Sequence, residues 1–278
     1  MTYWQSIVIG FLQGVTELFP VSSLGHSVIV PAWLGWHTLV QGQSANESFY
    51  LAFLVGLHVA TAIALLVRFR RDWARIIRGF FSAVAKRSIT TPDERLAMLI
   101  VLASIPVGIV GLAMEHTLRT IFAKPAAAAG FLTVNGLLLI GAERLKRRGG
   151  TRSLASFTTK DAIVVGTAQI GSLFAGISRS GITMSGGLLR GLDHEDAAKF
   201  SFLLATPIIF AAGAYKIPDL LGPNGNGIRG QIVVGSIVAG LAAYGAVRFL
   251  ERFFRTKTLY PFAVYCLIAG AISFARFV

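Results

Sequence analysis

Residues 14–26 read GVTELFPVSSLGH, and this stretch decides how the chain is organised. It lies in the middle of an apolar segment that runs from residue 3 to residue 36. It brings a carboxylate, a proline, two serines and a histidine into that segment. Irregular backbone at membrane depth is tolerated only where it lines a cavity or is buried in protein. The segment is therefore either one kinked helix or two half-length helices that enter and leave by the same side around a polar loop.

The composition of the whole chain is that of an integral membrane protein. Of its 278 residues, 54% are hydrophobic and only 14% are charged, whereas an average soluble domain carries roughly 25% charged residues. Six stretches contain no Asp, Glu, Lys or Arg and approach the length that a helix needs to cross a bilayer, roughly 20 residues. They cover residues 49–67, 96–114, 125–142, 200–215, 230–247 and 258–275. A second apolar segment, 162–192, is interrupted at FAGISRSG.

The basic residues follow the loops of this arrangement. The chain has 26 Lys and Arg against 13 Asp and Glu, a net charge of +13. If both interrupted segments are re-entrant hairpins, loops 68–95, 143–161, 190–199 and 248–257 hold 20 basic residues. The alternate set, which includes 115–124, 216–229 and both termini, holds five. Because cytoplasmic loops carry the excess of Lys and Arg, we expect both termini to lie outside the cytoplasm. The excess of basic residues is distributed by loop and does not form a nucleic-acid-binding motif. No nucleic-acid partner is therefore predicted.

The number of spans between the two interrupted segments predicts an inverted repeat. Three spans separate the two hairpins, so the first opens to the outside and the second to the inside. We call the interruptions of the two apolar segments the first and the second break. At an offset of 156 residues the two breaks and their flanks match in five pairs: Gln13 and Gln169, Thr16 and Ser172, Ser22 and Ser178, Gly25 and Gly181, Ser27 and Thr183. We expect an all-α integral membrane protein of about ten helices, in two inverted-topology repeats that each consist of a re-entrant hairpin and three transmembrane helices. The single membrane domain covers residues 1–278, with repeat one at 1–142, repeat two at 162–278 and a basic cytoplasmic connector at 143–161.

The first break carries titratable groups that are costly inside a membrane and therefore suggest function. Gln13 and Glu17 are four residues apart and share one face of a helix. Each polar residue also has a structural alternative. Glu17 is suited to an interfacial helix end, His26 to a hydrogen-bonded helix start, and Ser22 and Ser23 to helix caps.

The second break contains Arg179, a permanent cation flanked by hydroxyl-bearing residues and glycines. The planar guanidinium suits phosphate, and glycines let backbone N–H groups approach an anion at a helix start. The structural alternative is an ion pair with Glu17, which would also bring the two breaks together. Both breaks predict a site for a phosphorylated amphiphile, with a carboxylate and an imidazole for acid–base chemistry and oxygen ligands for Mg²⁺ or Ca²⁺.

These residues resemble those of a known family, the undecaprenyl-diphosphate phosphatases, also called bacitracin-resistance proteins. Residues 13–26, QGVTELFPVSSLGH, are similar to the family's [E/Q]-x-x-x-E helix followed by P-V-S-S-x-G-H. Residues 175–183, AGISRSGIT, resemble its P-G-x-S-R-S-x-x-T loop, and residues 200–207, FSFLLATP, resemble a segment downstream. The resemblance covers essentially the whole chain. It implies an inverted-repeat, re-entrant enzyme of the bacterial plasma membrane that removes the terminal phosphate of the C55 polyprenyl diphosphate and recycles the lipid carrier for peptidoglycan and other wall polymers.

The resemblance also implies roles for single residues. Glu17 would be the essential carboxylate and a ligand of a divalent cation, Mg²⁺ or Ca²⁺. Ser23 would be a nucleophile or proton relay, His26 an acid–base partner and Arg179 the catalytic cation. The substrate-binding residues would be Gln13, Ser22, Gly25, Gly176, Ser178, Ser180 and Thr183. An active site that faces outward is expected.

Three positions depart from the family pattern. Gln13 is allowed at the E-or-Q position but removes one anionic ligand, so a weaker affinity for metal is expected. Ala175 replaces the loop proline, which predicts a less rigid second break. Leu24 stands where Thr or Ser is commoner.

The sequence allows one alternative function and excludes another. An inverted-repeat transporter or flippase of a phosphorylated lipid or small anion, without hydrolysis, is the alternative. A lipid phosphatase of the vanadium-haloperoxidase-like superfamily would need an S-R-x₅-H-x₃-D run, but the residue six positions after Arg179 is Ser185, which excludes it. The choice between a phosphoserine intermediate and direct attack by water stays open, as does the oligomeric state, a homodimer included.

Overall fold

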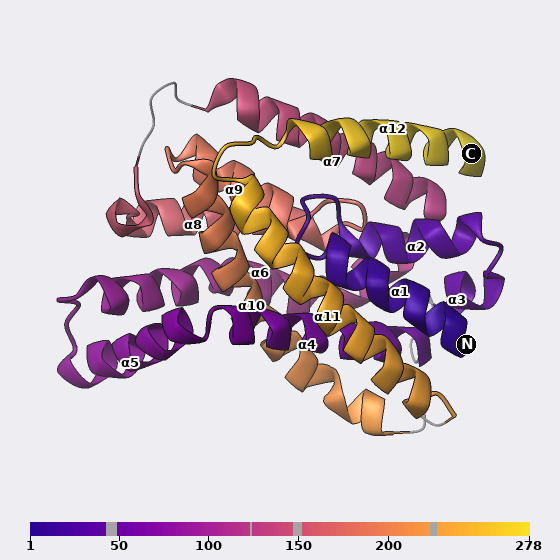
Figure 1. Ribbon diagram of the computed structural model, residues 1–278, viewed down its shortest axis with the longest axis horizontal. Helices are drawn as coiled ribbons and strands as arrows, with labels where there is room; N and C mark the ends of the chain where they lie inside the picture. Colours follow the sequence, from indigo (N-terminus) through magenta and orange to yellow (C-terminus); the bar gives the residue numbers. More distant parts are fainter. Residues whose placement is uncertain (43–48, 123, 147–151, 223–226) are drawn as a thin grey trace.

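Six long apolar helices form the frame of the computed structural model (Figure 1). The structure describes residues 1–42, 49–122, 124–146, 152–222 and 227–278, and within these residues six helices are long and apolar enough to cross a membrane. They are α4 (Phe49–Arg68), α6 (Pro92–Phe122), α7 (Pro125–Leu145), α10 (His194–Leu221), α11 (Arg229–Phe253) and α12 (Tyr260–Phe277). The first five each contain one of the predicted spans, and α12 begins and ends two residues after the sixth, 258–275. The prediction of an all-α, multi-pass membrane protein is confirmed.

Both interrupted segments fold as two half-length helices, which decides against a single kinked helix. The first consists of α1 (Tyr3–Thr16) and α2 (Ser23–Trp33). The second consists of α8 (Thr159–Ala168), a 3₁₀ turn (Gln169–Leu173) and α9 (Arg179–Leu189). In the first break Pro20 lacks a backbone N–H and cannot continue α1.

The two hairpins open in opposite directions. In Figure 1 the free ends of α1 and α2 point to the right, whereas those of α8 and α9 point to the left. Both chain termini lie at the right-hand end, and the turn between α5 (Arg70–Lys86) and α6 lies at the other. This placement agrees with the prediction that three spans between the hairpins make them open in opposite directions. Which end faces the cytoplasm stays a prediction.

Helices from the two halves of the chain pack against each other reciprocally. Helix α1 packs along α11, and α8 packs along α6, while α7 pairs with α12. The approach of α1 to α11 depends on Gly10, because a Cβ there would lie 3.1 Å from the Gly235 Cα. Small residues allow this close contact between membrane helices. The exchange of partners is the pattern that an inverted repeat would give, and the repeat itself stays a prediction.

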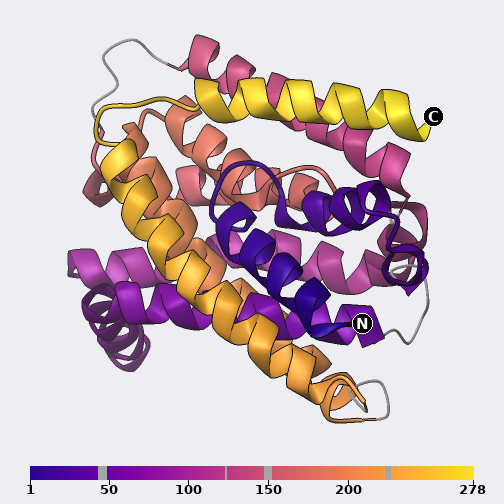
Figure 2. The same cartoon turned by 45° about the vertical axis from the view of Figure 1, so that its right-hand side comes forward.

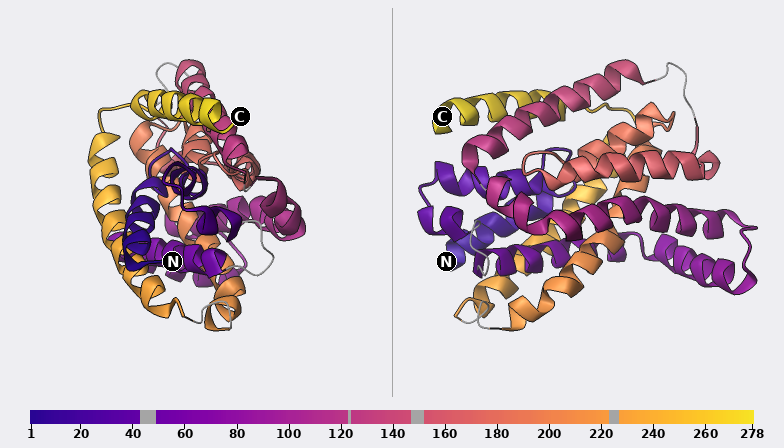
Figure 3. Two further views of the ribbon diagram at one scale, coloured as in Figure 1. Left: turned by 90° about the vertical axis from the view of Figure 1, so that its right-hand side faces the viewer. Right: turned by 180° about the vertical axis from the view of Figure 1, so that it is seen from behind.

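Two helices outside the predicted set raise the number of α-helices in the described residues to twelve, against the expected ten or so. One is the short α3 (His37–Gly42). The other is α5, which projects with the start of α6 beyond the rest of the bundle (Figure 3). Helix α5 is amphipathic, and Trp73 and Ile76 on its apolar face are buried. The span search missed both because neither is a membrane-length apolar run.

The predicted connector at 143–161 is shorter than expected. Helix α7 continues to Leu145 and α8 begins at Thr159, because Thr158 and Asp161 form a capping box at its start. Between them lies a 3₁₀ turn, η1 (Leu154–Ser156), while residues 147–151 lie outside the described residues. Arg152 and Arg190 both pair with Asp161, at 2.9 and 2.5 Å. These ion pairs fasten the connector to the end of α9.

Candidate active site

The two breaks touch in the interior of the bundle, where their loops lie side by side (Figure 2). The Ser22 hydroxyl accepts a hydrogen bond from the Gly176 N–H at 3.2 Å. A Cβ on Gly25 would lie 2.9 Å from the Gly176 Cα, and Gly176 has φ of +110°. Glycine is the residue that tolerates both the contact and this backbone conformation. Three of the predicted substrate-binding residues, Ser22, Gly25 and Gly176, therefore form the contact between the loops.

Matching serines start the second helix of each hairpin. Ser22 is the N-cap of α2, and its hydroxyl accepts from the Gly25 N–H at 3.2 Å. Ser178 is the N-cap of α9 and accepts from the Gly181 N–H at 3.1 Å. Both pairs belong to the set that matches at an offset of 156. The capping interpretation of Ser22 is confirmed.

Asn135 on α7 connects the two loops from the side. Its Nδ2 atom donates to the Pro20 carbonyl at 2.9 Å, and its Oδ1 accepts from the Ser178 N–H at 3.0 Å. The Ser180 hydroxyl donates to the Phe19 carbonyl at 3.0 Å. Buried backbone groups of both irregular loops thus find partners, as they must in a membrane.

Glu17 lies at the centre of the site, at the C-cap of α1, and is only 6% exposed. Its Oε1 atom pairs with the Arg179 Nη2 at 2.5 Å. Its Oε2 atom accepts hydrogen bonds from the Ser23 hydroxyl at 2.5 Å and from the Gln13 Nε2 at 3.1 Å. The structure therefore brings together four predicted site residues that come from both breaks.

The charges at this centre compensate one another. Arg179 and Ser23 are the first residues of α9 and α2, so two half-helix N-termini, which carry partial positive charge, lie beside the carboxylate. A buried ion pair recovers its desolvation cost only when both partners are present, so the loss of either leaves an uncompensated charge. Glu17 and Arg179 therefore depend on each other for burial.

Two polar atoms at the centre are buried without a hydrogen-bond partner, the Arg179 Nη1 and the Gln13 Oε1. The first is a charged donor that suits a phosphate oxygen. The second lies on the helix face of Glu17, and an amide and a carboxylate oxygen are ligands that hard divalent cations prefer. The described residues contain no group of three His, Cys, Asp or Glu that could hold a metal by itself. The residues therefore fit a cation that shares its coordination with the phosphates of a substrate.

His26 is held away from this centre. Its Nδ1 donates to the Ser22 carbonyl at 2.7 Å, and its Nε2 lies 2.7 Å from the Tyr265 hydroxyl on α12. The two rings are stacked, with centroids 5.7 Å apart. The predicted acid–base partnership with Glu17 is therefore not made through a direct hydrogen bond, and the catalytic role of His26 stays a prediction.

Thr183 supports the start of α9. Its hydroxyl is within hydrogen-bond distance of the Arg179 carbonyl, at 2.7 Å, and of the Ser201 hydroxyl on α10, at 2.6 Å. The hydroxyls of Ser178 and Ser180 lie 3.0 Å apart. These three residues surround Arg179 as predicted, and their contact with substrate stays a prediction.

Comparison with known proteins identifies the family. A match to the family described as bacitracin resistance protein BacA covers residues 6–272. The chain belongs to the BacA family. The undecaprenyl-diphosphatase of Mycolicibacterium paratuberculosis is 54% identical over 98% of this chain and 96% of its own length. The undecaprenyl-diphosphatase 2 of Frankia alni is 51% identical over 100% of this chain and 98% of its own length. The undecaprenyl-diphosphatase of Gluconacetobacter diazotrophicus is 46% identical over 99% of this chain and 96% of its own length.

In this member of the BacA family, three residues near the site were not predicted from the sequence. His58 on α4 places its Nε2 3.4 Å from the Glu17 Oε2, and Tyr265 and Asn135 contact His26 and the two loops. His58 lies within a stretch that contains no Asp, Glu, Lys or Arg, and a search restricted to those four residues passes over it. A histidine in a membrane span is the signal that would have found it.

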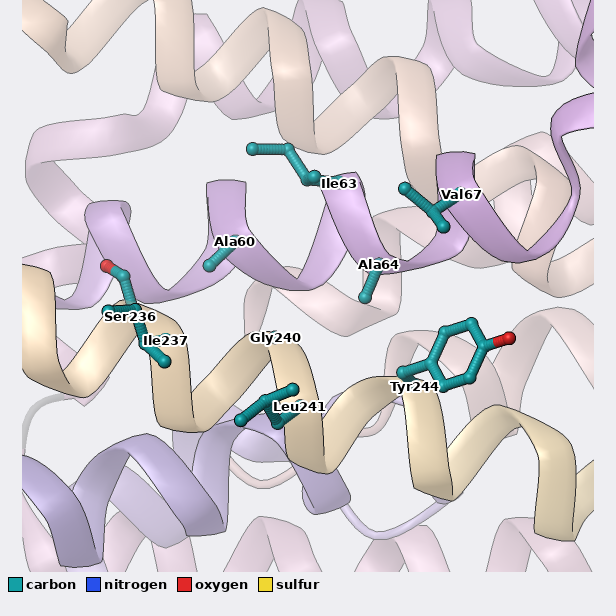
Figure 4. A pocket seen from close by; sticks show the side chains of 9 residues that line it. All are labelled: Ala60, Ile63, Ala64, Val67, Ser236, Ile237, Gly240, Leu241 and Tyr244. Carbon is teal, nitrogen blue, oxygen red and sulfur yellow. The ribbon is translucent and has the colours of Figure 1, made fainter.

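An apolar groove lies between α4 and α11 of this BacA family member (Figure 4). Its volume is about 450 Å³, and Ala60, Ala64 and Gly240 form its floor, while Ile63, Val67 and Leu241 are about half exposed or more. Helix α4 also carries His58, two residues before Ala60. The groove therefore lies on the same helix as a residue that faces Glu17.

Proposed function

We propose that the chain removes the terminal phosphate of undecaprenyl diphosphate and returns the monophosphate carrier to cell-wall polymer synthesis. Its membership of the BacA family and three relatives named undecaprenyl-diphosphatase, at 46–54% identity, support this activity. The observation that carries it is the group formed by Glu17, Ser23 and Arg179, in which the buried Arg179 Nη1 has no hydrogen-bond partner. A phosphoanhydride hydrolase needs these elements: an anion clamp, an oxygen nucleophile and a base.

Binding of the diphosphate is assigned to the second break and to the half-helix starts. The free Nη1 of Arg179 would donate to an oxygen of the terminal phosphate, while Nη2 stays with Glu17. The N-termini of α2 and α9 would add partial positive charge. Because phosphoryl transfer spreads negative charge over the transferred oxygens, donors placed here would stabilise the transition state more than the ground state.

Glu17 is proposed as the base. It accepts a short hydrogen bond from the Ser23 hydroxyl, at 2.5 Å, which is the geometry of a hydroxyl that donates to a carboxylate. If Ser23 attacks, its Oγ forms a bond to the terminal phosphorus, the bond from that phosphorus to the bridging oxygen breaks, and the hydroxyl proton passes to Glu17. Water then hydrolyses the phosphoserine. If water attacks directly, Glu17 takes the proton of that water and Ser23 orients it.

A divalent cation, Mg²⁺ or Ca²⁺, is proposed as cofactor. Glu17 and the Oε1 of Gln13 would hold it together with phosphate oxygens, and the cation would supply charge neutralisation at the diphosphate. Since Gln13 contributes a neutral oxygen, the affinity for the cation is expected to be weak without substrate.

The isoprenoid tail is proposed to stay in contact with lipid. The half-exposed apolar residues of the groove between α4 and α11 offer it a surface on the same helix as His58. The protein is proposed to sit in the bacterial plasma membrane with both termini outside the cytoplasm and the site facing outward.

The test is phosphate release from farnesyl diphosphate by the purified protein in detergent, with and without Mg²⁺ or Ca²⁺. Glu17→Gln and Arg179→Lys keep the size of each side chain but remove the carboxylate or the planar guanidinium, and we expect each to lower kcat/KM at least about 100-fold. Arg75→Lys, on the exposed surface of α5, is the matched control for the replacement of a guanidinium by an ammonium group and should keep the wild-type rate.

Wild-type activity in both site variants would remove these residues from the mechanism. If the wild type releases no phosphate under any condition but vesicles containing it take up a phosphorylated lipid, the chain is a carrier and the proposed function is wrong.

A further inference from the structure

The imidazole of His58 faces the Glu17 carboxylate. Its Nε2 lies 3.4 Å from the Glu17 Oε2. The ring orientation is fixed from behind, since its Nδ1 donates to the Leu54 carbonyl at 2.8 Å. The histidine in the sequence motif, His26, has both ring nitrogens engaged by Ser22 and Tyr265.

The contact bears on the orientation of the carboxylate. One oxygen of Glu17 pairs with Arg179, and the other accepts from Ser23 and Gln13 and faces His58. Arg179 still has a free nitrogen, Nη1, and an arginine readily takes both oxygens of a carboxylate in a bidentate pair. A rotation of Glu17 into that pair would turn Oε2 away from Ser23 and would occupy the nitrogen assigned to phosphate. A donor from His58 to Oε2 opposes this rotation.

We propose that His58 is a positioning residue, which in its protonated form donates from Nδ1 to Leu54 and from Nε2 to the Oε2 of Glu17, and so keeps the carboxylate turned toward Ser23. The role rests on the proposed phosphatase function. His58 acts through Glu17 and the proposal gives it no contact with the substrate. Its side chain is 26% exposed against 5% for Glu17, which places it at the edge of the site and not at its centre.

Three substitutions separate positioning from mere packing. In His58→Gln the amide nitrogen reaches the place of Nε2 and can still donate to Glu17. In His58→Asn the shorter amide reaches only the place of Nδ1 and keeps the bond to the Leu54 carbonyl. His58→Ala removes both. Gln and Asn are both neutral amides, so they form a matched pair that differs in reach.

The measurement is kcat and KM for phosphate release from farnesyl diphosphate, with the thermal unfolding midpoint of each variant. We expect His58→Ala and His58→Asn to lower kcat about 10- to 100-fold with KM unchanged, because a misplaced catalytic group slows the chemical step. We expect His58→Gln to recover most of the wild-type kcat. His37→Ala, an exposed histidine on α3, should match the wild type.

The outcomes are distinct. Equal kcat in the Gln and Asn variants, or a wild-type kcat in His58→Ala, would overturn the positioning role. A rise in KM with kcat unchanged would also overturn it, because His58 would then bind substrate. If His58→Ala alone fails to fold, the Gln and Asn pair decides. If the wild type itself releases no phosphate, the proposed function fails, and that result is separate from any difference among the variants.

Discussion

Two adjacent serines in the first break have different partners, and their chemistry follows from this. The Ser22 hydroxyl accepts from two backbone N–H groups, those of Gly25 and Gly176, and holds the loops together. The Ser23 hydroxyl donates to Glu17. One serine is committed to the fold and the other is available for reaction.

Ser23→Ala should therefore abolish activity and keep the fold. We expect kcat to fall at least about 100-fold with an unchanged unfolding midpoint. Ser22→Ala should destabilise the protein by about 1 kcal/mol through the loss of a helix cap. Phosphate release and thermal unfolding, measured on both variants, check the assignment. A stable, fully active Ser23→Ala variant would contradict it.

Tyr265 determines what the His26 ring can do. In Tyr265→Phe the His26 Nε2 loses its 2.7 Å partner while the ring stacking is kept. A hydrogen bond of this kind contributes about 1 kcal/mol, so if His26 takes part in the reaction we expect roughly a fivefold lower kcat. The Tyr265→Phe variant and the wild type are compared in the same assay of phosphate release. No change in kcat would mean that the reaction does not depend on the contact between His26 and Tyr265.

The sequence predicted the centre of the site better than its surroundings. Glu17, Ser23 and Arg179 were predicted because charge and hydroxyls stand out in apolar segments. His58 and Asn135 were missed, since each lies in an otherwise ordinary span and gains its meaning only from packing against the breaks. The partner of His26 was also missed, because Tyr265 lies 239 residues away.

At the scale of the helices, the close contact between the two breaks should be the least tolerant feature. Gly25→Ala would place a Cβ 2.9 Å from the Gly176 Cα, so the loops must separate. We expect a lower unfolding midpoint and a loss of activity of at least about tenfold, because a shift of about 1 Å in a site is costly. Gly141→Ala, on α7 with nothing within 4 Å of its added Cβ, is the matched control.

The control should be slightly more stable than wild type, since alanine favours a helix by about 0.5–1 kcal/mol over glycine. Equal effects of the two substitutions would show that the loops are not in firm contact.

The start of α8 should make stability depend on pH. Burial opposes ionisation of Asp161, but hydrogen bonds from Thr158, Arg152 and Arg190 outweigh it and hold the pKa of Asp161 below its usual range. A lowered pKa in the folded state contributes stability above the unfolded value of about 3.9, and this contribution is lost as the pH falls toward the folded pKa. Asp161→Asn should therefore be less stable than wild type at pH 7, with a gap that narrows below about pH 4.

Thermal unfolding of both proteins at neutral and acidic pH measures this gap. Glu195→Gln, at an exposed ion pair with Arg255, is the control and should show little difference at either pH. A gap that stays constant with pH would contradict the role of the Asp161 carboxylate.

At the scale of the whole molecule, the orientation in the membrane can be measured directly. Cys266 is the only cysteine of the sequence. In a Cys266→Ser background, a cysteine at the exposed Lys160 should resist an impermeant thiol reagent in intact cells, because residues 143–161 belong to the basic set. A cysteine at the exposed Arg276 should react. The reverse labelling pattern would invert the predicted topology.

The overall architecture was predictable to a large extent because hydropathy and loop charge follow from the membrane itself. All six spans and both broken segments were located from the sequence. Helix α5 was not, since it is amphipathic and depends on packing against α6. The early start of α8 was missed because it depends on the Asp161 capping box.

The ion pair between Glu17 and Arg179 joins residues that are 162 positions apart. At a synthesis rate of 5–20 residues per second, Arg179 leaves the ribosome roughly 8 to 32 s after Glu17. During that interval the carboxylate has no arginine to accompany it into the bilayer. The buried pair between the two hairpins can therefore form only after the second hairpin has been made.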